Sequence, residues 1–281
     1  MRNRRVENLL IKALLWLSAM GVSLLLLAVA GYVCFRGAGN ITLALLTEEE
    51  RFLEGTAGLL PAILNTLFVI AASLAVVLPL GVGAAVYLTE YAKNRWLVGA
   101  VEFAAQVLSG IPSILYAMLG ALVFCRRLGL QKTLLAGALT LAVMTLPTVL
   151  RTTQESLKAA PRSYREAALG LGAGLWPMIR TVVLPASADG VVTGCILAAG
   201  RVVGETAVLL YTAGLSMAMQ DFSGIQGLLH ASGTTLSTAL YVYAKERADF
   251  ASAFAAATVL LAITAVINLA AAAVGRRVRR V

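Results

Sequence analysis

The sequence is poor in charge and in catalytic side chains. Charged residues make up 13% of its 281 residues, about half the share of a typical soluble domain. There is one histidine, His230, and the three cysteines have neither metal-ligand nor redox spacing, which excludes a multi-histidine metal centre. The chain also lacks the G-x-x-x-x-G-K-[ST] loop that binds nucleotide phosphates, and it has no H-E-x-x-H pair. An ordinary soluble enzyme, an intramembrane enzyme and a chain that hydrolyses ATP by itself are therefore disfavoured, and no cofactor is expected.

Apolar residues are abundant instead. They form 59% of the chain, and the mean hydropathy is +0.85. A helix needs about 20 apolar residues to cross a bilayer, and lipid offers no partner for open backbone groups. The sequence therefore predicts an all-α membrane protein with six transmembrane helices, at Ala13–Phe35, Asn65–Leu88, Phe103–Cys125, Thr133–Leu150, Gly190–Thr212 and Phe250–Gly275.

The first apolar run follows a basic start and contains an Ala-x-Ala at Ala28–Ala30, as a secretory signal does. The run is 23 residues long, whereas the core of a signal peptide has about 7–15. We therefore expect an uncleaved span.

Lysine and arginine are distributed unevenly between the two sides of the predicted bundle. With both termini inside, fifteen of these residues lie on the inner side and seven on the outer side, and Arg201 lies within a span. The excess predicts cytoplasmic termini. The expected organisation is an N-terminal helix and outer loop over 1–58, a core of five spans over 59–275, and a basic cytoplasmic tail over 276–281.

The longest inner loop, about 151–185, reads as a structured element. Ser163 and Glu166 have the spacing of a capping box, in which each side chain accepts a hydrogen bond from the other residue's backbone. The glycines from Gly170 to Gly174 then favour a chain reversal. The loop is predicted to form a helix, a glycine turn and a second short helix that runs toward Leu184-Pro185.

The outer stretch 213–249 is rich in Gly, Ser and Thr. Leu236, Leu240 and Tyr243 have helical spacing. Two placements stay open, a helix that rests on the outer membrane face and a re-entrant segment. His230 in this stretch is expected to be incidental.

Arg201 and Glu205 are the main anomaly, because each costs about 2.5–3.5 kcal/mol in the middle of a span. Their i,i+4 spacing places them on one face of a helix, where they can pair. Nearby Gly194, Gly200 and Gly204 let another backbone approach. Two interpretations stay open: an anion path in which Arg201 binds an oxyanion, or a salt bridge that orients two helices.

A second unusual site is the sequence Ser109-Gly110-Ile111-Pro112-Ser113 in the third span. It frees backbone groups and adds hydroxyl donors at membrane depth, which is tolerated only against protein or a wet cavity.

The inner loop carries a recognisable pattern. Glu166-Ala167-Ala168-x-x-x-Gly172, nine residues, and then Val182-Val183-Leu184-Pro185 resemble the E-A-A-x-x-x-G-x(9)-I-x-L-P loop of ABC importer permeases. The resemblance implies the type I permease fold (MetI-like), with a coupling helix that docks in a groove of an ATPase subunit. By this resemblance the docking residues are Ser163, Glu166, Ala167, Ala168, Gly172, Leu184 and Pro185.

Three further segments resemble phosphate permeases: Arg201-Val-Val-Gly-Glu-Thr-Ala207, Ser109–Ile114 and Pro79–Ala92. The tail from Thr234 to Asn268 is more similar to the PstA type than to the PstC type. The resemblance implies a permease subunit of a phosphate importer in the bacterial cell membrane, with Arg201, Glu205, Thr206 and Ser113 along the substrate path. The implied partners are a PstC-like permease, two PstB-like ATPase subunits, a PstS-like external binding protein and phosphate.

Two alternatives stay open. One is a permease for another oxyanion, such as sulfate or molybdate. The other is a membrane scaffold or sensor that transports nothing, although such a protein needs neither a charge pair within a span nor a coupling loop.

Overall fold

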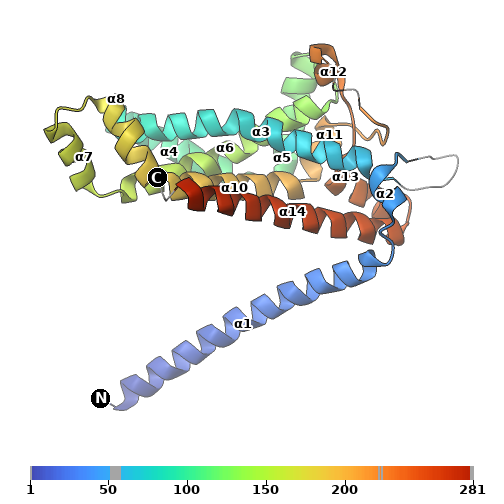
Figure 1. Cartoon of the computed structure of the whole chain (residues 1–281), viewed down its shortest axis with the longest axis horizontal. Coiled ribbons are helices and arrows are strands. Elements are labelled where there is room, and N and C mark those ends of the chain that lie inside the picture. The colour runs from blue at the N-terminus through green and yellow to red at the C-terminus, as the bar shows by residue number, and fades with distance from the viewer. Residues whose placement is uncertain (1, 51–57, 221, 223, 279–281) are drawn as a thin grey trace.

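The computed structural model describes residues 2–50, 58–220, 222 and 224–278, and helices dominate this part of the chain (Figure 1). The elements are α1 (Arg2–Ala38), α2 (Leu43–Thr47), α3 (Leu60–Val86), η2 (Tyr87–Tyr91), α4 (Arg95–Ser109), α5 (Ser113–Gly120), η3 (Ala121–Arg127), α6 (Leu134–Ala159), α7 (Arg162–Gly170), α8 (Leu175–Met178), η4 (Ile179–Val183), α9 (Leu184–Ala186), α10 (Ala188–Gly204), α11 (Ala207–Thr212), α12 (Gly224–His230), α13 (Leu236–Tyr241), η5 (Val242–Glu246) and α14 (Phe250–Val278), where η marks a π-helix.

Four single helices, α1, α3 with η2, α6 and α14, are long and apolar enough to cross a membrane. They confirm the first, second, fourth and sixth predicted spans. Two bent helix pairs raise the number of candidate spans to six. One pair, α4 with α5 and η3, turns by 101° and corresponds to the third prediction. This span is two helices separated at Gly110 and Pro112, which confirms the interruption predicted at Ser109–Ser113.

The fifth prediction, Gly190–Thr212, is also not one helix. The chain bends by 65° between α9 and α10, and α10 ends at Gly204. A separate short helix, α11, covers the rest of the predicted span. Together these breaks make the bundle a set of long helices with two interrupted elements inside it.

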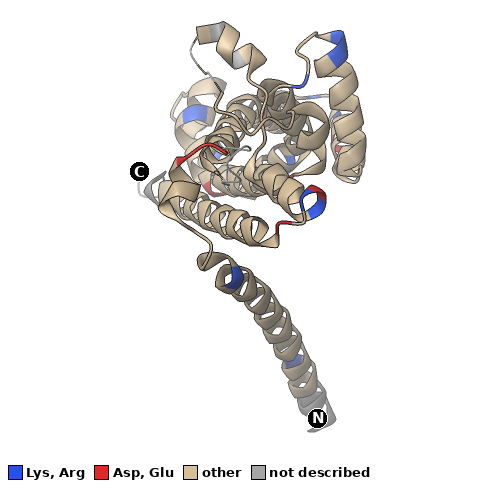
Figure 2. Ribbon diagram, turned by 90° about the vertical axis from the view of Figure 1, so that its right-hand side faces the viewer, with Lys and Arg blue, Asp and Glu red and all other residues tan. Residues whose placement is uncertain are grey.

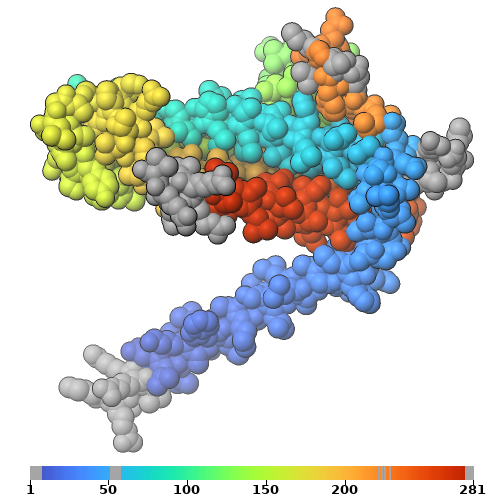
Figure 3. Space-filling view, viewed as in Figure 1, coloured from blue at the N-terminus to red at the C-terminus, as the bar shows by residue number. Residues whose placement is uncertain are grey.

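Helix α1 stands apart from the other helices. It meets the bundle near its C-terminal end, where the Tyr32 and Phe254 rings lie 5.9 Å apart and Thr258 Oγ1 donates to Val33 O at 3.2 Å. From there it diverges, and the space-filling view shows it separated from α14 over most of its length (Figure 3). Its apolar side chains are therefore exposed, which suits a helix surrounded by lipid or by another subunit.

The core lies where α3, α6 and α10 pack together. Small residues allow this contact, since a Cβ at Gly190 or Gly194 would collide with Ser156 or Thr152 of α6. Close approach through small residues is a common way for helices to pack in lipid, where no hydrophobic force drives them together. The prediction for Gly194 is thus confirmed. A Cβ added at Gly200 or Gly204 would instead meet no atom within 4 Å, so these two glycines face open space.

The segment 231–239 lies inside the bundle rather than on its surface. Nearly all of its residues are buried, and α13 packs on α3 and α14. Two bonds attach it to α3: Asn65 Nδ2 donates to Thr234 O, and Thr66 Oγ1 accepts from Leu236 N, both at 2.9 Å. The segment is thus packed among the helices, which favours the re-entrant placement over a helix that rests on the outer face.

Charged residues fall mainly at helix ends and in loops, while the long helices are almost uncharged (Figure 2). The N-terminal end of α1 and the C-terminal end of α14 lie at the end of the bundle that carries α7 and α8 (Figure 1). Helices α2 and α13 lie at the opposite end. This arrangement matches an even number of crossings.

Candidate translocation and docking sites

The break after α10 determines the surroundings of Arg201 and Glu205. Glu205 has extended backbone angles (φ −80°, ψ 117°), so it is not on the same helical face as Arg201. Within the described part of the chain no ion pair or hydrogen bond joins the two side chains. The predicted i,i+4 pair is therefore wrong, because the helix ends one residue too early.

Glu205 instead has local partners. Its Oε1 accepts from the backbone N–H of Val208 at 3.3 Å, at the start of α11, where a carboxylate also suits the positive end of the helix. Its carbonyl oxygen accepts from Ser237 Oγ at 3.0 Å. Thr206 is the N-cap residue of α11 and is half-buried, and its hydroxyl makes no capping bond. Glu205 thus stabilises the break between the two helices.

Arg201 lies half-buried on α10 beside the core that holds α5, α6 and α11. It is close enough to Tyr116 for its charge to act on that hydroxyl. Gly200 precedes Arg201 and Gly204 follows it on α10, and a Cβ at either glycine would meet no atom within 4 Å. A guanidinium at the edge of an open helix face, with no carboxylate within ion-pair distance among the described residues, has donors available for an anion.

Ser113 lies at the beginning of α5, on the bent connection from α4. It is half-buried, and Ser109 is exposed. Across the bend, the Tyr116 hydroxyl donates to Leu108 O at 2.8 Å and satisfies a carbonyl at the end of α4. Because α5 also packs on α11, the interrupted third and fifth elements meet in the bundle.

Tyr116, Ser237 and Asn65 are site residues that the sequence analysis did not assign. Ser237 and Asn65 attach the segment 231–239 to its neighbours. Asn65 Oδ1 is buried and has no hydrogen-bond partner among the residues that the structure describes. The signal for Asn65 was its polarity within an apolar run, and no sequence signal marked Tyr116.

The inner loop forms the predicted helix, turn and helix. Gly172 has φ +84° between α7 and α8, which confirms the glycine turn. The predicted capping box is wrong, because α7 begins at Arg162, one residue before Ser163. Its N-cap is Pro161, and no side chain caps it. The ring of Pro161 fixes the φ angle at the start of α7, so the helix begins there without a hydroxyl cap.

Helix α7 presents a surface of apolar and charged side chains, with Arg162 as well as Glu166 exposed. Glu166 and Ala167 are exposed, while Ala168 packs toward the bundle. Leu184 is half-buried and Pro185 exposed, where α9 leads into α10. The large apolar side chains exposed on this loop are Tyr164, Leu169, Leu171, Leu175 and Trp176. Exposed apolar side chains that lie together in this way are typical of a protein or membrane contact.

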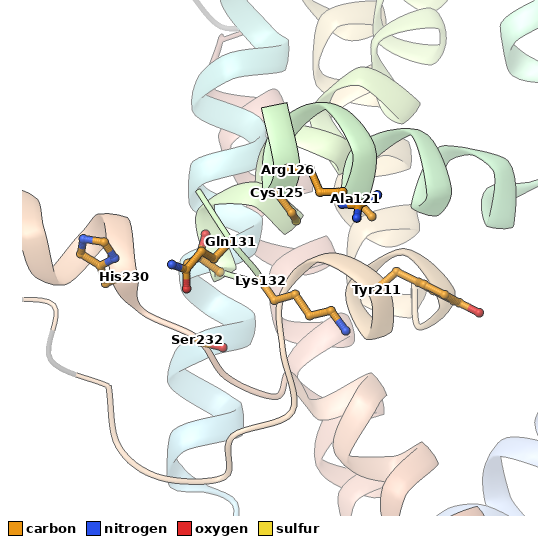
Figure 4. Close-up of a pocket in the computed structure, with 9 residues that line it drawn as sticks. Ala121, Cys125, Arg126, Gln131, Lys132, Tyr211, His230 and Ser232 are labelled. Atoms are coloured by element: carbon orange, nitrogen blue, oxygen red, sulfur yellow. The ribbon is translucent and has the colours of Figure 1, made fainter. Parts of the chain in front are cut away.

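The opposite end of the molecule has a pocket of about 590 Å³. Figure 4 shows its basic side chains, Arg126 and Lys132, extending to the side where Tyr211 lies, while His230 lies on the other side. The remaining residues that line it are Ala121, Cys125, Gln131, Thr133 and Ser232. His230 thus borders a cavity that the sequence did not indicate.

Residues 77–280 match the model of the family described as binding-protein-dependent transport system inner membrane component. This match covers both bent elements, Arg201 and the whole α7–α9 loop. The chain belongs to this family.

Its curated relatives include a probable ABC transporter permease protein, YqgI, of Bacillus subtilis, which is 32% identical over 79% of this chain and 75% of its own length. The phosphate transport system permease protein PstA 1 of Mycobacterium tuberculosis (strain CDC 1551 / Oshkosh) is 35% identical over 76% of this chain and 69% of its own length. PstA of Yersinia pestis is 37% identical over 63% of this chain and 60% of its own length.

Solved structures show the same fold. A bacterial alginate ABC transporter in complex with its pentasaccharide-bound periplasmic protein gives a TM-score of 0.67 at 18% identity, over 96% of this chain and 95% of that one. The MetNI methionine ABC transporter gives 0.59 at 20% identity, over 79% and 94%. The all-α type I importer permease fold is therefore confirmed. This family member is a permease-type membrane subunit of an ABC importer, which works with ATPase and substrate-binding partners.

Proposed function

We propose that this permease carries inorganic phosphate and is of the PstA type. The observation that carries the proposal is the similarity to curated PstA proteins, at 35% identity over three quarters of the chain. The other proposed members of the complex are a PstC-like second permease, two PstB-like ATPase subunits and a PstS-like external phosphate-binding protein.

The chemistry of the α10–α11 break supports an oxyanion as cargo. Arg201 offers a planar set of N–H donors beside the open face of Gly200 and Gly204, and a guanidinium matches the oxygens of a tetrahedral anion. Thr206 and Ser113 add neutral hydroxyls from the two interrupted elements. Glu205 stabilises the break between α10 and α11, since its carboxylate caps α11 rather than pairing with Arg201.

The surface of α7 supports docking of an ATPase subunit. Its exposed apolar side chains border Glu166, whose carboxylate suits a basic partner group. Ser163, Ala167 and Gly172 lie on or directly after the same helix, and Leu184-Pro185 leads from the loop into α10. We place this end in the cytoplasm, with both termini, because basic residues are most numerous there. The organisation into 1–58, 59–275 and 276–281 belongs to the same proposal.

The test is ATP-dependent uptake of radioactive phosphate into proteoliposomes that hold the full chain with its permease, ATPase and binding-protein partners. If excess sulfate and molybdate do not suppress phosphate uptake, the result supports phosphate as the cargo. Uptake of sulfate or molybdate without phosphate uptake would assign a different oxyanion. A complex that assembles but transports none of these anions and is not stimulated by them would contradict the oxyanion proposal.

A further inference from the structure

One side chain of α7 joins three elements at the end of the bundle where α7 lies. Arg165 Nη2 and Nε donate to Glu90 Oε1 at 2.7 and 3.2 Å, and this salt bridge leaves only 18% and 7% of the two side chains exposed. Nη1 donates to Ala160 O at 3.0 Å, and Nη2 donates to Leu157 O at 2.8 Å. We call this set of bonds the Arg165 clasp.

The partners in the clasp belong to the ends of two long helices. Glu90 lies in η2, the π-helix that continues α3, and short π-helical turns often occur at functional sites. Leu157 and Ala160 lie at the C-terminal end of α6, where carbonyl groups lack partners within the helix. Arginine suits this position, because its rigid fork supplies several donors at once.

Little else fixes α7 to these helices. No residue of α7 is buried, and its most extensive contacts are with α8 and η4 of its own loop. Its Ala168 packs, half-buried, against the apolar cluster formed by α3, η2, α4, α6, α8 and η4. The apolar contact of α7 itself with α3 and α6 is thus small, and the bonds of Arg165 are the directed links between α7 and the ends of these two helices.

We propose that Arg165 is the positioning residue through which α7 moves as one body with the ends of α3 and α6. This inference rests on the proposed docking role of α7. Coupling between distant sites is carried by rigid elements and hydrogen-bonded ion pairs. With the clasp intact, a displacement of α7 by a docked ATPase subunit reaches α3, which carries Asn65, and α6, which packs on α10. Without the Arg165 clasp, the loop is displaced alone and α3 and α6 do not move with it.

A second ion pair at the same end supplies a matched control. Lys158 Nζ lies 2.7 Å from Glu102 Oε1 and joins α6 to α4, but the two side chains are 55% and 39% exposed. Exposed pairs of this kind contribute little. Arg165→Met and Lys158→Met each remove one cation from the same face, and only the first opens the clasp.

The experiment measures backbone hydrogen–deuterium exchange in the assembled complex together with phosphate transported per ATP hydrolysed. In Arg165→Met, exchange over 162–170 is expected to rise about tenfold and the transport ratio to fall about tenfold, a size typical of coupling between sites. The ATPase subunits still co-purify, exchange within α6 stays at the wild-type level, and Lys158→Met behaves as wild type. Glu90→Gln, which keeps the shape and the two carbonyl bonds, gives a smaller change in the same direction.

Two results would overturn the inference. One is the same α7 exchange and transport ratio in Arg165→Met as in Lys158→Met. The other is an equal rise in exchange throughout α6, because that would make Arg165 a residue of general stability. Hydrogen–deuterium exchange can be measured without cargo. A wild-type complex that carries no phosphate would therefore refute the proposed substrate, and the exchange data would still decide the role of Arg165.

Discussion

The hydroxyl of Tyr116 donates a hydrogen bond of 2.8 Å to the carbonyl oxygen of Leu108, across the bend of 101° between α4 and α5. The same ring is buried in the core beside α10 and lies within electrostatic range of Arg201. One aromatic side chain therefore holds the interrupted third element and borders the charge on the fifth. The two irregular parts of the bundle are joined in this way, although their residues are far apart in the sequence.

The first prediction concerns this bond. Tyr116→Phe keeps the ring and removes one of the hydrogen bonds that Leu108 O accepts, while the bond from Ile111 N at 3.2 Å stays. The unfolding free energy should therefore fall by about 1 kcal/mol. The measurement is thermal unfolding of the purified complex in detergent. Tyr241→Phe, at a residue that is 38% exposed, is the control and should leave the transition unchanged. Equal transitions for both variants would show that the bend does not depend on the hydroxyl.

The second prediction concerns Arg201. Hydrogen bonds to a charged group contribute about 1.5–3 kcal/mol, so Arg201→Gln should reduce phosphate uptake by about 10- to 150-fold. Arg201→Lys should be intermediate, because an ammonium keeps the charge without the planar fork. Lys245→Gln removes an exposed cation from η5, which directly follows α13, and serves as control. Normal uptake by an assembled Arg201→Gln complex would place the anion path elsewhere.

The third prediction concerns docking. Glu166→Lys reverses an exposed charge at the centre of the α7 surface, and like charges across an interface oppose binding. Co-purification of the ATPase subunits should decrease by about tenfold or more. Glu155→Lys makes the same change on an exposed position of α6 and should have no effect. Equal losses in both variants would indicate a response to net charge alone.

The fourth prediction concerns pH. Burial, followed by the nearby Glu50 carboxylate, raises the pKa of Tyr243 to about 12. The unfolded phenol titrates near pH 10, so the unfolded state loses its proton first as the pH rises. Stability is fully present below pH about 10 and should decrease by about 2–3 kcal/mol as the pH rises to about 12.

The check on Tyr243 is the phenolate absorbance of wild type minus that of Tyr243→Phe, recorded as a function of pH. A difference signal centred near pH 10 would contradict the buried phenol.

The fifth prediction concerns helix packing. Gly194→Val places a side chain against Thr152 of α6, and overpacking of this kind costs about 1–3 kcal/mol. Gly200→Val adds the same group to the open face of the same helix and should leave stability unchanged. The measurement is the temperature at which the complex loses its monodisperse size-exclusion peak. Equal temperatures for the two variants would mean that α6 and α10 do not approach closely at Gly194.

Much of this architecture followed from the sequence. Long apolar runs became α1, α3, α6 and α14, since lipid leaves the backbone no alternative to internal hydrogen bonds. The turn at Gly172 followed from a conformation that glycine adopts at low cost. In each case, residues close in the sequence determine the outcome.

Only the tertiary structure decided the rest. The helix break at Glu205 depends on Ser237, 32 residues away, and Asn65 holds Thr234 across 169 residues. Arg165 forms its salt bridge with Glu90, which is 75 residues away in the sequence. A polar side chain within an apolar run shows that a partner is needed, because burying it alone is costly. Which group satisfies such a side chain is fixed only when the helices pack. The pairing of Arg201 with Glu205 was therefore wrong, while the helix and glycine turn of the inner loop, which depend on local residues, were confirmed.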